Sequence, residues 1–398
     1  MLSYMFSLRA SKVSTDGEKI NELLSRGVSE VIEKDALKKA LLSGEQLRVK
    51  LGIDPTSPHL HLGRSVLLLK LRDFQKLGHK IVLIIGDFTG VIGDTSDKDS
   101  ERPMLSPEVI QENLKTYTAQ AGKILDMDEV EVRHNSEWLK DISYEELGRQ
   151  ADQFSLAEFI ARDNIRRRLD DGKRVSLREL LYPLMQGYDS VAVKADVELG
   201  GTDQRFNLLA GRSLQALYEQ KPQHILTTNL IEGLDGRKMS SSWGNTINLS
   251  DTAEDMFGKV MRLHDELIET YFIHTTRVPL TKVSEIMDED PRVSKEKLAL
   301  AVVSLYHGED AAEKAKELFT NTFSRGEMPM DVPEISRKEG ESVKEVLLRS
   351  GSVSSGKELE RLLTEGAVSL EGEKIKNIQE EARFGVYKIG KRRFLRVN

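Results

Sequence analysis

The sequence contains no cysteine and no long uninterrupted apolar run. The absence of cysteine excludes disulfide bonds, thiolate catalysis and cysteine-bound zinc or iron–sulfur clusters. It suits a reducing compartment, so we expect a cytoplasmic protein. No stretch approaches the roughly 20 apolar residues that a membrane helix needs, and we expect no membrane partner. The first residues, "MLSYMFSLRASK", also lack the apolar centre and cleavage site of a signal peptide.

The chain of 398 residues exceeds what one ordinary core holds, so we expect two or three domains. Its composition, 39% hydrophobic and 31% charged, is typical of a soluble globular protein. The net charge of −7 argues against indiscriminate coating of nucleic acid but allows a local basic surface. From Arg337 onward there are 14 Lys and Arg against 10 Glu, a net of +4 that leaves −11 for the rest. A basic terminal module on an acidic body suggests that the module meets an anion.

The first zone, up to about Asn245, alternates predicted strands and helices. "LRVKLGI" and "HKIVLIIGDFTG" indicate buried strands, because their β-branched runs end at glycine or aspartate. "SVLLLKLRDFQKLG" between them has helical spacing and ends at Gly78. This strand–helix–strand unit predicts a parallel α/β sheet. The charged stretch from Leu105 to about Leu181 predicts helices that cross between the two halves of the sheet.

Two further zones follow along the chain. From about Asp251 to Arg325 the pattern is helical, and "SRGEMPMDVPE" after it is typical of a linker. In the last zone, Ser342 and Glu345 have capping-box spacing before an apolar run. A second short helix ends at Gly366, and the pair 371–372 (Glu-Gly) predicts a turn between two strands.

Two prolines, two histidines and a glycine stand together in "DPTSPHLHLGRS", just before the first predicted helix. A metal site is disfavoured, because His59 and His61 have no third ligand nearby in the sequence. Two interpretations stay open from these residues: a plain loop whose histidines cap the helix, and a phosphate site. The phosphate site would use Gly52 and Gly63 for close backbone approach, and the helix N-terminus with His61 as donor. It would lie at the carboxyl end of a strand, where open α/β sheets bind ligands.

A second polar stretch, "GLDGRKMSSSWGN", places Lys238 among glycines and serines. Such a loop offers one strong cation and several hydroxyl donors for the charge on a transferring or departing phosphate. Taken alone, a flexible polar surface loop explains the same residues equally well.

Together, "HLGR" at 61–64 and "KMSSS" at 238–242 resemble the paired signatures of class I aminoacyl-tRNA synthetases, in the order and separation of that family. "YPLMQGYDS" and "VELGGTDQRFN" extend the resemblance over nearly the whole chain and narrow it to the bacterial tyrosyl-tRNA synthetase family, which ends in an S4-like domain. The resemblance implies an α/β fold with a Rossmann-type parallel-sheet catalytic domain at 1–245, carrying an inserted helical dimerisation segment at about 106–180. It further implies an α-helical anticodon-side domain at 246–326 and a small α+β S4-like RNA-binding domain at 337–398.

The resemblance also implies a two-step reaction. The carboxylate of tyrosine attacks the α-phosphate of ATP, bound with Mg²⁺, and gives tyrosyl-adenylate and pyrophosphate. The tyrosyl group then passes to the 3′ end of tRNA(Tyr). In-line displacement at phosphorus depends on positioning and charge stabilisation, which agrees with the absence of a recognisable Ser-His-Asp signature. No tightly bound cofactor is implied, and a homodimer is.

Four groups of site residues carry over from the family by position. The catalytic group comprises Thr56, His61, Lys98, Arg102, Lys238 and Ser241. The tyrosine-binding group comprises Lys50, Asp94, Tyr182, Gln186, Asp189 and Gln204. The ATP-binding group comprises Gly52, Asp54, His61, Gly63, Arg64, Gly201, Asp203, Lys238, Met239, Ser240, Ser241 and Ser242. The RNA-binding group comprises Lys388, Lys391, Arg392, Arg393 and Arg396.

The predicted tyrosine pocket centres on one helix. Tyr182 and Gln186 are four residues apart and share a helix face, and Asp189 follows three further on. The resemblance implies that the first two, with Asp94, hold the ammonium group of the substrate. It implies that Asp189 accepts a hydrogen bond from the phenol hydroxyl. Phenylalanine would leave that carboxylate unpaired, so it would be rejected.

Three positions depart from the family pattern. Arg64 stands where histidine is commoner, and its role as a donor to ATP follows from the match alone. Ser241 stands where many class I enzymes carry a second lysine. Lys50 replaces a second phenol-binding tyrosine of many members, although its ammonium could reach the phenol oxygen or Asp189.

Three other functions explain the sequence less completely. A tryptophanyl-tRNA synthetase shares the fold and both signatures but ordinarily lacks the S4-like tail. A catalytically inactive RNA-binding protein would not need the charged site residues that are present. A nucleotidyltransferase acting on another small molecule would not need the set at 182, 186 and 189. "RRR" at 166–168 could touch the tRNA acceptor arm, but a solvated helix face is favoured.

Overall fold

The computed structural model describes residues 13–94, 104–324 and 333–398, apart from 339, 354 and 391–392. The chain divides into two compact units, Met1–Lys316 and Glu317–Asn398, and each is described by itself. Four predicted site residues lie outside the described residues: Lys98, Arg102, Lys391 and Arg392. No helix within the described ranges is both long enough and apolar enough to cross a membrane.

A twisted sheet forms the centre of the first unit, and its strands follow the order β1-β6-β5-β2-β3-β4. Neighbouring strands are parallel except for β1, which is antiparallel to β6. The strands are β1 (Val28–Ile32), β2 (Arg48–Ile53), β3 (Lys80–Ile85), β4 (Val130–His134), β5 (Val197–Gly201) and β6 (His224–Thr228). The predicted strand–helix–strand unit is confirmed as β2, α3 (Leu62–Lys76) and β3.

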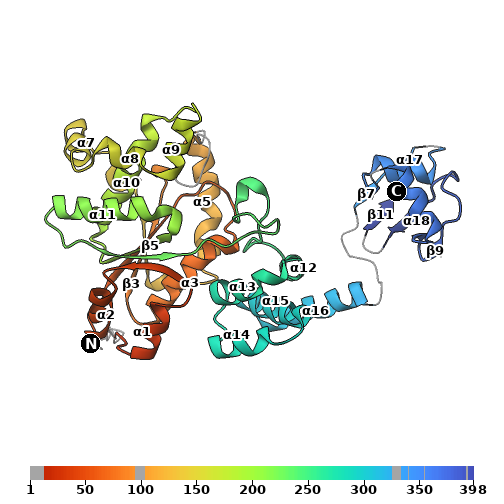
Figure 1. Cartoon of the computed structure of the whole chain (residues 1–398), viewed down its shortest axis with the longest axis horizontal. Helices are drawn as coiled ribbons and strands as arrows, with labels where there is room; N and C mark the ends of the chain where they lie inside the picture. The colour runs from red at the N-terminus through yellow and green to blue at the C-terminus, as the bar shows by residue number, and fades with distance from the viewer. Residues whose placement is uncertain (1–12, 95–103, 325–332, 339, 354, 391–392) are drawn as a thin grey trace, which may run out of the picture. The chain divides into compact units, whose positions relative to one another are not determined.

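The connections between strands place a crevice in the middle of this sheet. Helix α3 connects β2 to β3, and α11 (Arg205–Leu217) connects β5 to β6 in the opposite direction along the sheet. Because parallel crossovers are right-handed, α3 and α11 lie on opposite faces (Figure 1). The direction of the connections changes between β5 and β2, which are neighbours. Open α/β sheets bind ligands at the carboxyl ends of strands beside such a change.

Strand β4 corrects one sequence-based expectation, because it lies within the range 106–180 that was expected to be helical. It follows α5 (Pro107–Ala121) and pairs in parallel with β3, so this part of the range belongs to the sheet. Its "VEVRH" run alternates apolar and polar residues, and each is only half-buried. The alternation spans only five residues inside a charged stretch, so the helical expectation for the whole range outweighed it.

The remaining helices of the first unit surround the sheet and continue beyond it. Before and beside the strands lie α1 (Gly17–Leu23), α2 (Lys34–Leu42), α4 (Thr89–Ile92), α6 (Ser136–Leu139), α7 (Tyr144–Ala151), α8 (Leu156–Ile160), α9 (Asp163–Asp170) and α10 (Leu177–Val193). After β6, the predicted helical zone consists of α12 (Ala253–Met261), α13 (Ile268–Thr275), α14 (Leu280–Met287), α15 (Pro291–His307) and α16 (Glu309–Ser324). This zone packs on α3, where the buried hydroxyl of Tyr306 donates to Ser65 Oγ at 2.9 Å.

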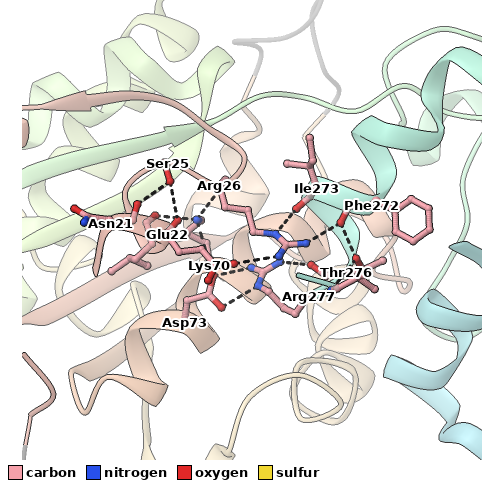
Figure 2. A network of polar contacts seen from close by, with 12 residues as sticks. Asn21, Glu22, Ser25, Arg26, Lys70, Asp73, Phe272, Ile273, Thr276 and Arg277 are labelled. Atoms are coloured by element: carbon pink, nitrogen blue, oxygen red, sulfur yellow. Dashed lines mark hydrogen bonds and ion pairs between the residues drawn. The ribbon is translucent and has the colours of Figure 1, made fainter. Parts of the chain in front are cut away.

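Three cations, two of them buried and the third half-buried, link α1, α3 and α13 (Figure 2). Arg26 donates to two backbone carbonyls in the last turn of α13, and Lys70 donates to the carbonyls of Leu23 (2.9 Å) and Arg26 (2.7 Å). Arg277 forms an ion pair with Asp73 on α3 (2.8 Å). The last carbonyls of a helix lack partners inside the helix and carry partial negative charge. These cations therefore cap two helices while they fix both against α3.

The second unit begins within α16, and its part from residue 333 onward is a small α+β fold. Its sheet follows the order β7-β11-β10-β8-β9. The elements are β7 (Glu334–Ile335), α17 (Val343–Arg349), α18 (Gly356–Thr364), β8 (Val368–Leu370), β9 (Glu373–Lys374), β10 (Gly385–Ile389) and β11 (Arg393–Val397). The predicted capping box of Ser342 and Glu345 is confirmed at the start of α17. Glu371 and Gly372 both have positive φ, which confirms the predicted turn between β8 and β9.

Candidate active site

A cavity of about 350 Å³ opens at the carboxyl ends of β2 and β5. The predicted site residues that line it are Gly52, Asp54, Thr56, His61, Gly63, Arg64, Asp94, Tyr182, Gln186, Asp189, Gly201, Asp203, Gln204, Lys238, Met239, Ser240, Ser241 and Ser242. Segments far apart in the sequence therefore meet in one place. Among the described residues of the predicted catalytic, tyrosine-binding and ATP-binding groups, Lys50 alone does not line this cavity.

His61 stands at the start of α3 but does not cap it with its side chain, so the interpretation of this histidine as a cap is wrong. Its imidazole is buried, and Nδ1 has no hydrogen-bond partner among the described residues. Burial and the nearby charges of Arg64 and Lys238 lower the pKa of His61 to about 3. A neutral imidazole with a buried, unpartnered Nδ1 is therefore part of the cavity lining. His59 instead lies on the exposed side, with Nδ1 2.9 Å from Ser250 Oγ.

Arg64 holds the loop that precedes α3. Its guanidinium donates to the carbonyl oxygen of Asp54 (3.0 Å), to the hydroxyl of Tyr117 (3.0 Å) and to Thr56 Oγ1 (3.2 Å). The Thr56 hydroxyl accepts this bond, so its own proton remains available to another acceptor. Arg64 thus fixes the backbone and one hydroxyl of the first motif.

Asp54 is the central carboxylate of the floor of the cavity. Its Oδ1 accepts from Thr89 Oγ1 (2.7 Å) and its Oδ2 accepts from the Tyr182 hydroxyl (2.8 Å). Burial raises the pKa of Asp54 to about 6, against these two hydrogen bonds that lower it. Gly86 leaves room for this arrangement, because a Cβ there would lie 2.0 Å from Asp54 Oδ1.

Asp189 lies buried on α10 and is held by two residues that follow β4. Trp138 Nε1 donates to Oδ1 (2.8 Å) and Asn135 Nδ2 donates to Oδ2 (3.4 Å). Burial raises the pKa of Asp189 to about 7, although Lys50 and these donors lower it. Sequence analysis missed Asn135 and Trp138, because their position depends on the unrecognised strand β4.

A chain of side-chain amides lines the neighbouring wall. Gln204 Nε2 donates to Asp94 Oδ2 (2.7 Å), and Gln204 Oε1 accepts from Asn207 Nδ2 (3.1 Å). The same Asn207 amide donates to Gln186 Oε1 (3.0 Å). The predicted residues Asp94, Gln186 and Gln204 are therefore brought together, with Asn207 as a link that sequence analysis missed.

Lys50 is completely buried below the pocket. Its ammonium group lies 2.9 Å from Glu198 Oε1 on β5, and it donates to Ser190 Oγ (2.7 Å) and to the carbonyl of Gln186 (3.0 Å). An ammonium has three protons, and these three partners account for them. The structure thus places Lys50 against Glu198 instead of against a ligand in the cavity, which the family match had implied.

The second motif forms a loop that is organised by Asn245. The Lys238 ammonium lies 2.8 Å from Asp203 Oδ2, so the two motif residues that the family match assigns to ATP face each other. Asn245 Oδ1 accepts from the Ser240 amide (2.8 Å), and its Nδ2 donates to the Lys238 carbonyl (3.0 Å) and to Asp235 Oδ1 (2.6 Å). Asn245 is the last residue of the stretch "GLDGRKMSSSWGN", but the sequence alone did not indicate this role.

The basic residues predicted to bind RNA are partly committed to other contacts. Lys388 lies over the ring of Phe394, with 5.6 Å to the centroid. Arg393 is ion-paired with Glu358 (2.8 Å), and Arg396 lies 3.6 Å from a carboxylate oxygen of Glu334.

The run at 166–168 is only partly the solvated face that its sequence favoured. Arg166 and Arg167 are exposed. Arg168 is buried and forms an ion pair with Glu179 on α10 (2.6 Å). One of the three arginines therefore packs α9 against the helix that carries the pocket.

Comparisons with known proteins agree with this site. Residues 42–324 match the family described as tRNA synthetases class I (W and Y). The chain belongs to this family. Both signature motifs, at 61–64 and 238–242, contribute residues to the lining of the described cavity.

Two curated relatives are similar to this chain over nearly its whole length. A tyrosine–tRNA ligase of Oleidesulfovibrio alaskensis is 44% identical over 383 residues, covering 94% of this chain and 96% of the relative. A tyrosine–tRNA ligase of Thermotoga maritima is 43% identical over 387 residues, covering 95% of this chain and 96% of the relative.

Solved structures share the fold of the first unit. A truncated mitochondrial tyrosyl-tRNA synthetase of Coccidioides posadasii aligns with a TM-score of 0.62 at 26% identity, over 75% of this chain and 91% of that one. The tyrosyl-tRNA synthetase of Archaeoglobus fulgidus, solved with L-tyrosine, aligns with a TM-score of 0.59 at 22% identity, over 75% of this chain and 99% of that one.

Proposed function

We propose that this chain is a tyrosine–tRNA ligase, which activates tyrosine with ATP and then transfers it to the 3′ end of tRNA(Tyr). The observation that carries the proposal is that both signature motifs and the buried carboxylate Asp189 line one cavity. The curated relatives that cover nearly the whole chain carry the same activity in their names. The fold alone would not distinguish this activity from activation of another amino acid.

In the first step, a carboxylate oxygen of tyrosine attacks the α-phosphorus of ATP, and the bond to the departing pyrophosphate breaks. Negative charge grows on the phosphate oxygens, so donors fixed in advance lower the barrier. His61 supplies a neutral N–H, and the Thr56 hydroxyl, oriented by Arg64, supplies a proton without charge. Lys238 adds a cation, and Ser241 lies on the same loop. Lys98 and Arg102, outside the described residues, remain proposed partners of pyrophosphate.

Tyrosine would be selected by its two polar ends. Asp189 offers a carboxylate to the phenol hydroxyl, and Trp138 and Asn135 keep it oriented. Tyr182 and Asp94 lie on the wall where the ammonium group of the substrate would bind. A site built to pair with a hydroxyl rejects the analogue that lacks it, because its own polar group is left unpaired.

ATP would bind as its Mg²⁺ complex, with Gly52, Gly63 and Gly201 allowing its close approach and Asp203 facing its ribose. No group of three acidic, His or Cys residues suited to a metal ion occurs among the described residues, so the Mg²⁺ is proposed to arrive with ATP. No tightly bound cofactor is proposed.

Larger partners and location are further parts of the proposal. The helical zone at 246–326 and the S4-like unit at 337–398, through Lys388, Lys391, Arg392, Arg393 and Arg396, would meet the anticodon side of tRNA in the cytoplasm. Two copies would associate through the segment at about 106–180, where Tyr144 is 94% exposed and Leu177 is 78% exposed. Strongly exposed large apolar side chains of this kind are suited to burial in a protein interface.

The test is amino-acid-dependent exchange between ATP and labelled pyrophosphate without tRNA, with tyrosine, phenylalanine and tryptophan offered in parallel. We expect exchange with tyrosine alone. Asp189→Ala should relax the choice of amino acid, whereas Lys238→Ala should slow exchange with little change in tyrosine binding. Exchange with tryptophan would contradict the assigned substrate, and the absence of exchange with all three would overturn the enzyme assignment.

A further inference from the structure

The buried pair of Lys50 and Glu198 lies directly below the proposed tyrosine pocket. Both side chains are at most 1% exposed, and their charged groups are 2.9 Å apart. Taking two charges out of water is costly, and a buried pair is tolerated only where further hydrogen bonds satisfy it. This pair therefore needs a complete set of partners, and those partners lie on the helix that carries the pocket.

Glu198 gathers donors from three elements. Gln186 Nε2 (3.2 Å) and Ser190 Oγ (3.1 Å) reach it from α10, and Gln223 Nε2 reaches it from the start of β6. Lys50 completes the set from β2 and also binds the carbonyl of Gln186. Asp189 lies between the two tethered positions of α10, so its placement depends on this network.

The network packs closely against Gly211 on α11. A Cβ on Gly211 would lie 2.5 Å from Gln223 Nε2, 3.0 Å from Ser190 Oγ and 3.3 Å from Glu198 Oε2. Helix α11 thus closes the network from the far side. Close packing of this kind transmits a change at one member to its neighbours.

We propose that Lys50 and Glu198 are positioning residues that hold the tyrosine-reading face of α10 and balance the charge beside Asp189. The inference rests on the proposed activation of tyrosine. Lys50 occupies a position where the family match implied direct contact with the phenol group, but all three of its protons are engaged elsewhere. It therefore acts on the substrate through Asp189.

The two charges act on Asp189 in opposite directions. Lys50 lowers the pKa of this carboxyl and Glu198 raises it, while burial, the largest influence, raises it. The other groups near Asp189 are Asn135 and Trp138 from the segment after β4, which donate to it, and Tyr182 on α10. Arg133 lies over the Trp138 ring and pairs with Glu137. Removing one charge of the pair leaves the other unbalanced. The two single variants must therefore shift the pKa of Asp189 in opposite directions.

The experiment measures the pH dependence of tyrosine binding, by equilibrium dialysis without ATP, and of kcat/KM for tyrosine in pyrophosphate exchange. Lys50→Met should raise the pH midpoint of the acidic limb, and Glu198→Gln should lower it. A shift of about one pH unit is expected, which is a tenfold change in ionised Asp189 well below the midpoint. The KM for ATP should stay within about twofold, since neither residue lines the cavity.

Controls separate this role from a general loss of structure. Lys70→Met removes another buried lysine, remote from the pocket, and should leave the midpoint unchanged. Asp189→Asn should abolish the limb. Midpoints that move in the same direction, or not at all, would overturn the proposal while tyrosine-dependent exchange in the parent protein still supports the enzyme assignment. If Lys50→Met does not fold, Glu198→Gln, which keeps the size of the side chain, decides the question by its downward shift.

Discussion

The ammonium nitrogen of Lys238 lies 2.8 Å from Oδ2 of Asp203. Lys238 belongs to the second signature motif, and Asp203 lies in the short 3-10 turn Thr202–Gln204 that follows β5. The proposed function assigns the first to phosphate and the second to ribose. ATP would have to exchange this contact for contacts of its own. The pair is therefore the place where nucleotide binding and loop position are coupled.

Replacing Lys238 by methionine should lower kcat of pyrophosphate exchange by about 10²-fold, because a donor aimed at developing phosphate charge is lost. The KM for tyrosine should change little, since Lys238 is assigned to phosphate and forms an ion pair with Asp203, which is not a residue of the tyrosine group. Steady-state exchange kinetics at varied ATP and tyrosine measure both quantities. Lys221→Met, at an exposed position, serves as the matched control and should behave like the parent. An equal rise in both KM values would argue against a role in the chemical step.

Replacing His61 by glutamine should lower kcat by about 10²-fold without moving the pH profile. The pKa of His61 is lowered to about 3, so the ring is neutral throughout the range from pH 5 to 9. The pH limb near neutrality should then belong to carboxyl groups such as Asp189, whose pKa is raised to about 7. The measurement is kcat/KM against pH for both proteins. His59→Gln is the control, and a limb that vanishes with His61 would refute the neutral-donor role.

Replacing Asn245 by alanine should impair the second motif without touching a substrate. Its side chain joins the backbone at Lys238 and Ser240, and a buried donor or acceptor left without a partner costs about 1–3 kcal/mol. We expect kcat of exchange to fall at least tenfold while tyrosine binding is retained. Limited trypsin digestion should also become faster at Arg237 or Lys238. Asn21→Ala, at an exposed position on α1, should show neither effect.

Because of the cation cluster in Figure 2, the free energy of unfolding should depend on pH in the alkaline range. Burial lowers the pKa of Lys70 to about 8, below the value of about 10.5 expected in the unfolded chain. Between pH 8 and 10.5 the unfolded state binds more protons, so the free energy of unfolding contributed by this group rises with pH. Below pH 8 the full penalty of the buried charge is present. The rise is of the order of 2–3 kcal/mol.

Urea unfolding at pH 7.5 and pH 10 measures this contribution. Both tryptophans of the chain, Trp138 and Trp243, lie in the first unit, so their fluorescence reports its unfolding. The stability of the parent relative to Lys70→Met should increase with pH. The same comparison with Lys39→Met, at an exposed position on α2, should be flat. A difference that falls with pH would show that the sign is wrong.

Local patterns were sufficient to predict much of the fold. Strands β2 and β3 lie inside the sheet and are mostly buried, and their β-branched runs end at glycine or aspartate, so both were easy to recognise. The capping box at Ser342 and the turn at Gly372 depend on neighbouring residues, and both are confirmed. Strand β4 was missed because its alternating pattern spans only five residues within a charged stretch, and its place in the sheet depends on pairing with β3.

The site shows the same division. The two motifs were recognisable because each is contiguous, and the cavity unites them. The partner of Lys50 could not be predicted, because Glu198 lies on a different strand, and only the β2–β5 pairing brings them together. Asn135 and Trp138 were missed for a similar reason, since their contact with Asp189 follows from where β4 ends. RNA binding by the second unit and dimerisation of the first stay predictions.

The antiparallel pairing of β1 with β6 has a consequence for the synthesis of the chain. Strand β1 leaves the ribosome well before its partner strand: Glu30 and Thr227, which share a hydrogen bond, are 197 residues apart. At roughly 5–20 residues per second, β1 waits about 10–40 s for its partner. Unpaired strand edges invite association with other chains. Strand β1 is thus made long before it is paired, and the charge of Glu30 within it is the kind of feature that disfavours edge-to-edge association meanwhile.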